Sequence, residues 1–128
     1  MSTINVKQNI EATVKSYVSS FIDARVENNP QLVNRDTTPD CLRSMLPSPL
    51  GGGGTMNNEA YEVIFAQGLK AGGMHANNIT DLVVDVDARK AAVTSVADLV
   101  MGGEKMSLDF SWFLHLNDDG TKIKRIVD

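Results

Sequence analysis

Residues 104–116 read EKMSLDFSWFLHL and decide the fold class, because apolar and polar side chains alternate along them. Alternation at every second position is typical of a β-strand with one buried face. We therefore predict a strand over Glu104–Leu116 whose apolar face lines the interior of the protein. The residues on that face are Leu108, Phe110, Trp112, Leu114 and Leu116.

Turn signals on both sides of this strand predict a meander. Gly102-Gly103 precedes the strand, and Asp118-Asp119-Gly120 follows it. Both stretches suit tight hairpins, since glycine tolerates the positive φ angles that such turns need. The apolar, β-branched composition of the neighbouring segments predicts three more strands, over Met74–Val84, Lys90–Met101 and Thr121–Asp128.

The first half of the chain has helical patterning instead. Apolar residues recur at three- and four-residue steps as far as Pro30, which predicts one long amphipathic helix. Pro39–Leu46 follows a threonine and predicts a short second helix. Asn57 or Asn58 would cap a third helix that ends at Gly72-Gly73.

Helices that precede a run of antiparallel strands indicate an α+β fold. We expect residues 1–128 to form a single domain, because 128 residues are the size of one domain and suffice for a hydrophobic core. A long curved antiparallel sheet with N-terminal helices on its concave face would form a cone. A pocket is expected wherever those helices leave the wide end of the cone unfilled.

Composition argues against several functional classes. A formal net charge of -4 disfavours nucleic-acid binding, and no apolar run approaches the ~20 residues of a membrane helix. The single cysteine, Cys41, rules out an internal disulfide and a cysteine-built zinc site, and we expect it to be buried. His75 and His115 lack acidic partners at ligand spacing, so we expect no metal site. The first residues lack a signal-peptide stretch, so a cytoplasmic location is expected.

Several stretches form an ordered set of motifs. Residues 35–47 read RDTTPDCLRSMLP, residues 57–59 read NNE, residues 89–90 read RK, and residues 114–127 read LHLNDDGTKIKRIV. In this order they resemble the motifs of small fungal SnoaL-like proteins of the NTF2-like superfamily, whose first motif is R-x-P-D-C-x-x-x-L-P. The resemblance covers nearly the whole chain. It implies a cone-shaped α+β barrel that forms a homodimer through its sheet.

The same resemblance implies a function. It points to a cofactor-independent isomerase or cyclase that acts on a hydrophobic, polycyclic intermediate of secondary metabolism, such as a meroterpenoid, a polyketide or an indole alkaloid. The chain departs from the family pattern at Phe110, where tyrosine is common, at Arg43, where histidine is common, and at Asp128, where glutamate is common. These departures concern the reaction more than the fold.

Asp128 and Arg35 are the predicted catalytic pair. Asp128 matches the family's carboxylate at the end of the last strand, where desolvation would raise its pKa and let it take and return a proton. Arg35 resembles the family arginine upstream of the Asp-Cys pair and would hold a substrate oxygen. The alternatives are a solvated carboxylate at a frayed strand end and a surface arginine beside Asp36.

Five further residues are predicted to contact the substrate. The aromatic ones would form an apolar wall or supply a hydroxyl, the arginine a polar contact, and the histidine a proton shuttle. Packing in the core and positions on the surface remain the alternatives. The residues are Phe110, Trp112, Tyr61, Arg43 and His75.

Other polar features are given structural roles. Asp109, Ser111 and His115 alternate with the apolar positions and should face solvent or a dimer partner. Gly51–Gly54 lacks the Gly-Lys-Ser/Thr of a phosphate loop and is interpreted as a mobile flap. The alternatives to an isomerase or cyclase are a dehydratase or hydrolase using the same residues, and a non-catalytic dimeric module that binds a small ligand.

Overall fold

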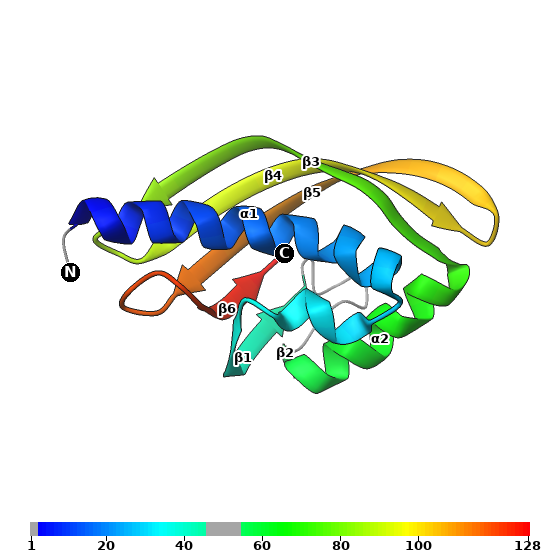
Figure 1. Cartoon of the computed structure of the whole chain (residues 1–128), viewed down its shortest axis with the longest axis horizontal. Coiled ribbons are helices and arrows are strands. Elements are labelled where there is room, and N and C mark those ends of the chain that lie inside the picture. The colour runs from blue at the N-terminus through cyan, green and yellow to red at the C-terminus, as the bar shows by residue number, and fades with distance from the viewer. Residues whose placement is uncertain (1–2, 46–54) are drawn as a thin grey trace.

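Two helices pack against the concave face of one curved sheet in the computed structural model of the protein, which describes residues 3–45 and 55–128 (Figure 1). Helix α1 (Thr3–Glu27) runs along the sheet, and helix α2 (Asn58–Ala71) lies near one end of it. A short 3₁₀-helix, η1 (Pro30–Asn34), leads from α1 into the first strand. The predicted α+β class, with helices covering a curved sheet, is confirmed.

The sheet has six strands in the order β2-β1-β6-β5-β4-β3. Neighbouring strands run antiparallel, except for β1 and β6, which pair in parallel. The sheet is therefore mixed, and the expectation of a purely antiparallel meander is wrong in this respect. The strands are β1 (Thr37–Ser44), β2 (Thr55–Asn57), β3 (Gly72–Asp85), β4 (Lys90–Met101), β5 (Glu104–Leu116) and β6 (Ile123–Val127).

The short helix predicted over Pro39–Leu46 is wrong, because most of this stretch forms strand β1. The strand pairs with β2 on one side and with β6 on the other, so its backbone groups are satisfied by the sheet. Its side chains alternate accordingly: Cys41 and Arg43 are buried, as expected for the cysteine, while Leu42 is 42% exposed. Leu46 and the predicted flap Gly51–Gly54 lie outside the described residues.

The remaining boundaries follow the predictions closely. Asn57 caps α2 by accepting a hydrogen bond from the backbone N–H of Ala60, and Gly72 ends the helix with a φ of 133°. The turn at Gly102-Gly103 joins β4 to β5, again with positive φ angles. Capping residues and turn glycines thus predicted the element boundaries most accurately.

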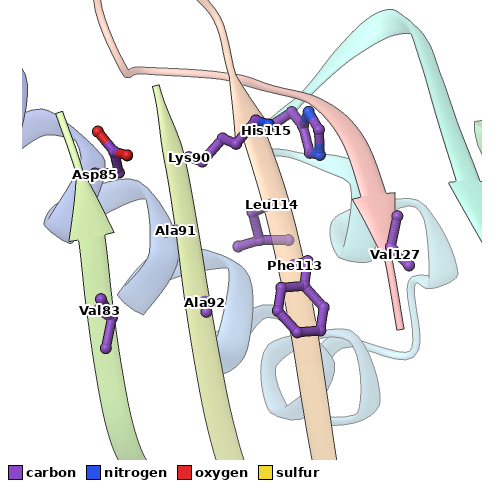
Figure 2. A pocket seen from close by; sticks show the side chains of 9 residues that line it. All are labelled: Val83, Asp85, Lys90, Ala91, Ala92, Phe113, Leu114, His115 and Val127. Atoms are coloured by element: carbon purple, nitrogen blue, oxygen red, sulfur yellow. The ribbon is translucent and has the colours of Figure 1, made fainter. Parts of the chain in front are cut away.

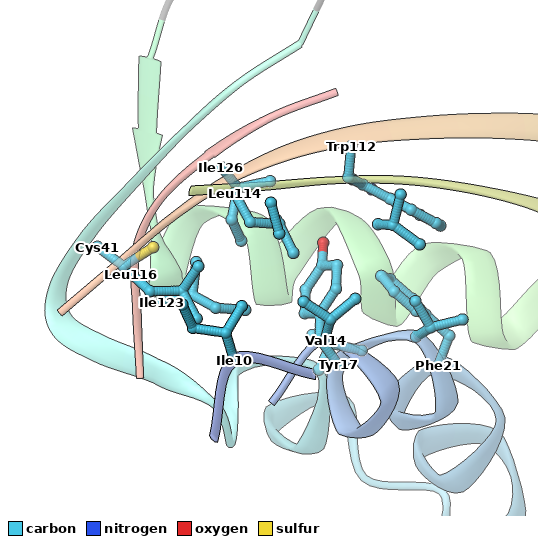
Figure 3. Packing of buried hydrophobic residues seen from close by; sticks show 14 of the residues in the cluster. Ile10, Val14, Tyr17, Phe21, Cys41, Trp112, Leu114, Leu116, Ile123 and Ile126 are labelled. Carbon is cyan, nitrogen blue, oxygen red and sulfur yellow. The ribbon is translucent and has the colours of Figure 1, made fainter. Parts of the chain in front are cut away.

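The hydrophobic core lies between α1 and the concave face of the sheet (Figure 3). One face of α1 meets the inward side chains of β5 and β6, and Trp112 packs edge-on against Tyr17 with 5.7 Å between ring centroids. Each fully buried side chain of this kind contributes about 1.5–3 kcal/mol. The residues labelled in Figure 3 are Ile10, Val14, Tyr17, Phe21, Cys41, Trp112, Leu114, Leu116, Ile123 and Ile126.

Helix α1 is hydrogen-bonded to the turn between β5 and β6 and packs closely against it at Gly120. The Thr13 hydroxyl donates to the Gly120 carbonyl oxygen at 2.8 Å, and the Asn9 side chain donates to the Asp119 carbonyl oxygen at 2.9 Å. A Cβ atom on Gly120 would lie 2.7 Å from Cγ1 of Ile10, and the φ angle of Gly120 is +77°. Both the close approach and the backbone conformation therefore require glycine.

We expect Gly120→Ala to lower the free energy of unfolding by about 2–4 kcal/mol, measured by urea denaturation. The variant combines left-handed backbone strain with overpacking against α1. Gly103→Ala is the matched control, since Gly103 has a φ of +87° but no atom within 4 Å of its added Cβ. Equal losses in the two variants would contradict this contact.

Candidate functional site

A cavity of about 330 Å³ lies between α2 and the concave face of the sheet. Helix α2 has no buried residue, so its apolar face is turned to this cavity instead of being sealed in the core. From α2 the cavity is lined by Tyr61, Ile64, Phe65 and Gly68. The rest of the lining is Phe21, Met45, Gly73, Met74, Leu99, Met101, Phe110, Trp112 and Asp128.

Aromatic rings make up one wall of the cavity. Phe110 stacks on Trp112 with 5.3 Å between centroids, and Phe21 stacks on Trp112 at 5.7 Å. Tyr61 and Phe65 stack at 6.1 Å along α2. The aromatic residues predicted to contact a substrate, Phe110, Trp112 and Tyr61, therefore do lie together around one cavity.

Asp128 places a carboxyl group at this apolar cavity. Its backbone N–H donates to the Ser44 carbonyl oxygen at 3.0 Å, which extends the pairing of β6 with β1 by one residue. Its side chain is hydrogen-bonded by Trp112, while Oδ1 is buried without a hydrogen-bond partner. Burial raises the pKa of Asp128, and the nearby Arg43 and Trp112 offset only part of that effect.

Arg43 is a buried cation beside the cavity, with only 2% of its surface exposed. Its guanidinium carbon lies 3.4 Å from the centroid of the Tyr61 ring and 5.9 Å from that of Tyr17. Nη1 and Nη2 have no hydrogen-bond partner. Burial opposes the charge, but Tyr17, Tyr61 and Asp128 outweigh it and raise the pKa of Arg43, so the group stays positive.

Arg43 and Asp128 reach the same interior because β1 and β6 are paired in parallel. Arg43 is in register with Ile126, whose side chain is buried. Asp128 stands two residues further on, and residues two apart on a strand share a face. No ion-pair contact joins Arg43 to a carboxylate within the part of the chain that the structure describes, so the two charges interact without touching.

Arg35 does not take part in this arrangement, and the structure does not bring it to Asp128, its predicted partner. Its Nη1 donates to Oδ2 of Asp23 at 2.8 Å, and its Nε donates to the Ser16 hydroxyl at 3.2 Å. A second carboxylate, that of Asp36, lies 3.6 Å from Nε. These partners belong to the partly exposed side of α1 and to the residue after Arg35, which holds the guanidinium away from the cavity.

His75 is also separate from the cavity. It is exposed on β3, and its Nε2 lies 3.1 Å from the Gly72 carbonyl oxygen. It lines a different groove, together with Asp98 and Lys105. The structure therefore does not bring His75 to Asp128, as a proton shuttle would require.

Tyr17 is the residue that sequence reasoning missed. Its ring packs in the core, but its hydroxyl points from α1 toward the sheet (Figure 3), is buried, and has no hydrogen-bond partner. Burial raises the pKa of Tyr17, and Arg43 and Asp128 both act on it electrostatically. The one sequence feature that pointed to a role for Tyr17 was a tyrosine at an otherwise apolar position of the first helix.

The polar residues between the apolar positions of β5 face outward as predicted. Asp109 and Ser111 are exposed, and His115 is partly exposed, whereas Trp112 is buried on the opposite face. These three residues lie outside the cavity lining.

Comparison with solved structures identifies the architecture. BvnE pinacolase from Penicillium brevicompactum superposes with a TM-score of 0.82 at 17% identity, over 99% of this chain and 86% of that one. AusH from Aspergillus nidulans gives 0.76 at 21% identity, over 94% and 82%. An NTF2-like protein of unknown function from Burkholderia pseudomallei gives 0.65 at 15%, over 94% and 88%. The chain has the NTF2-like fold.

The resemblance drawn from the sequence motifs is thus confirmed at the level of the fold. No family model and no curated protein sequence matches the chain. Within residues 3–45 and 55–128 of this NTF2-like chain, neither helix combines the length and apolar character needed to cross a membrane.

Proposed function

We propose that this protein is a cofactor-free isomerase or cyclase that acts on a hydrophobic, polycyclic secondary-metabolite intermediate. One observation carries the proposal: a carboxyl group with an unpaired oxygen, Asp128, stands in an otherwise apolar cavity beside the unpaired cation of Arg43. A carboxyl group whose pKa is raised toward neutrality can accept a proton and give it back. Among the similar solved structures, BvnE is named a pinacolase, which supports catalysis in this fold.

The proposed reaction moves one proton out and back. Ionised Asp128 takes a proton from a carbon or hydroxyl group of the substrate, and the electron pair left behind moves onto a substrate oxygen. The positive field of Arg43 stabilises that developing negative charge. Protonated Asp128 then returns the proton at a different atom, so composition and oxidation state are unchanged. General acid–base catalysis of this kind contributes roughly 10²–10⁴-fold.

The shape of the aromatic wall would supply the rest of the rate acceleration. Phe110, Trp112 and Phe21 form a continuous stack on one side of the cavity. Flat rings of this kind restrict a polycyclic substrate to few orientations, which brings the reacting atoms together before the proton moves. Stacked aromatic faces also stabilise positive charge on a substrate carbon.

A conversion assay without added cofactor tests the proposal. The dialysed protein is incubated with apolar polycyclic ketones and alcohols from fungal extracts, and the products are separated by liquid chromatography with mass detection. A product of unchanged mass and new retention time supports an isomerase or cyclase. Loss or gain of water supports the dehydratase or hydrolase alternative, and a ligand retained unchanged supports a carrier.

We also propose that the protein forms a homodimer through the outer face of its sheet. Figure 2 shows a groove there in which Phe113 and Val83 lie beside Lys90 and Asp85. Phe113 is 56% exposed and Val83 is 60% exposed, and both pair with Ala92 of β4, so they belong to one contiguous apolar patch of the kind that marks interaction sites. Lys90 and Asp85 are cross-strand partners of opposite charge, so a two-fold related copy would offer each its complement.

Val83→Lys is expected to raise the dimer dissociation constant at least about tenfold, because it buries an unpaired charge in the contact. Sedimentation velocity at several concentrations measures the change. Val63→Lys is the matched control, since Val63 is 63% exposed but belongs to α2 and lies outside the groove. A monomeric wild-type protein, or equal weakening by both variants, would contradict the proposed contact.

A further inference from the structure

Four buried polar atoms that lie in or behind the lining of the cavity make no hydrogen bond. They are Nη1 and Nη2 of Arg43, the hydroxyl of Tyr17 and Oδ1 of Asp128. Electrostatic interactions link all three residues, so the atoms belong to one cluster. Proteins pair more than about 90% of such groups, and an unpaired set of this size calls for an explanation. A bound ligand that supplies the missing partners is the simplest one.

The charges of the cluster indicate a neutral ligand. Arg43 carries one positive charge and ionised Asp128 one negative charge, and the remaining cavity lining is almost entirely apolar. A carboxylate or an ammonium ion on the ligand would leave one buried charge uncompensated, which is strongly unfavourable. The pair is balanced only when the ligand itself carries no charge.

The hydrogen-bonding capacities indicate which groups the ligand carries. A guanidinium group only donates, so the side of the cluster at Arg43 needs an acceptor such as a ketone oxygen. An ionised carboxylate only accepts, so Oδ1 of Asp128 needs a donor such as a hydroxyl group. The Tyr17 hydroxyl can do either and places no further restriction.

We propose that the cavity binds a neutral, apolar molecule that carries a ketone and a hydroxyl group together at one end. The inference rests on the proposed function, because it places those two groups at Asp128 and Arg43. Arg43 lies one layer beneath the lining, under the ring of Tyr61, so the ligand reaches the guanidinium when that ring turns aside. The apolar body of the ligand then lies against Phe110 and Trp112.

Four compounds of closely similar shape test the inference. Benzoin carries both groups, deoxybenzoin lacks the hydroxyl, 1,2-diphenylethanol lacks the ketone, and 2,3-diphenylpropanoic acid is charged. We expect benzoin to bind at least about tenfold more tightly than each of the others, because every other compound leaves a buried group unpaired. Calorimetry measures the affinities, and the emission of Trp112, the single tryptophan of the chain, reports binding at the cavity.

Three variants assign the two preferences to residues. Asp128→Leu should abolish the preference for benzoin over deoxybenzoin, and Arg43→Met the preference over 1,2-diphenylethanol. Ser111→Ala, on the outer face of β5 and outside the cavity lining, should leave both preferences intact. Equal affinities for the neutral compounds, tightest binding of the acid, no binding of benzoin, or loss of the preferences in Ser111→Ala would overturn the inference. These affinities need no turnover, so their failure is distinct from a failure of the catalytic proposal.

Discussion

Asp128→Asn is expected to lower kcat by roughly 10²–10⁴-fold, because the amide cannot accept the proton that the reaction moves. The substitution keeps the size of the side chain, and its oxygen can still accept the hydrogen bond from Trp112. Folding should therefore be retained, and the substrate should still bind. The measurement is turnover under saturating substrate, with circular dichroism to confirm the fold.

The control for this variant is another aspartate on the same sheet. Asp109 is exposed on the outer face of β5, so Asp109→Asn removes a carboxylate without touching the cavity. It should leave kcat unchanged. A second readout is the pH profile: since the base must be ionised, the wild-type rate should rise with pH through the raised pKa of Asp128. Full turnover by Asp128→Asn would remove this carboxylate from the mechanism.

Arg43→Met is expected to lower kcat by about 10²–10³-fold, the usual effect of removing a group that stabilises developing negative charge. The same variant should lower the free energy of unfolding, because it leaves the buried carboxyl group of Asp128 without the positive charge that favours its ionised form. Turnover is therefore expressed per folded molecule, which separates the loss of activity from the loss of stability. Turnover and urea denaturation measure the two effects.

Arg35→Met is expected to give a different pattern and so separates the two arginines. Arg35 bonds to Asp23 and Ser16 on the partly exposed side of α1, and exposed ion pairs contribute at most about 1 kcal/mol. We expect a small loss of stability and full turnover. If Arg35→Met lost its activity while Arg43→Met kept it, the site would be the one expected from sequence motifs and not the one built by the fold.

The sequence was sufficient for the elements whose signals are local. Alternation along Glu104–Leu116 and the glycines at 102, 103 and 120 predicted the central hairpins, because a turn and its flanking strands are contiguous in the chain. Phe110 and Trp112 were placed on the inner face for the same reason. These residues line the cavity because that face carries most of the apolar side chains of β5.

The sequence was insufficient where pairing is non-local. Thr37–Ser44 begins like a capped helix, and it becomes a strand only because β2 and β6 lie on either side of it. The helical interpretation hid the fact that Cys41 and Arg43 point to the same interior. The motif resemblance made Arg35 the catalytic partner of Asp128 and Arg43 only a substrate contact, since no local pattern says which arginine reaches Asp128.

The coupling of a desolvated Asp128 to Arg43 is tested most directly by the pKa of the Asp128 side chain, measured by carbon-13 NMR on protein labelled at aspartate and assigned with the Asp128→Asn spectrum. We expect a pKa above the ordinary value of 3.8, a further rise in Arg43→Met, and no change in Arg35→Met. The rise follows because removing a nearby positive charge destabilises the carboxylate. A pKa at or below 3.8, or a response to Arg35→Met and not to Arg43→Met, would contradict a desolvated Asp128 coupled to Arg43.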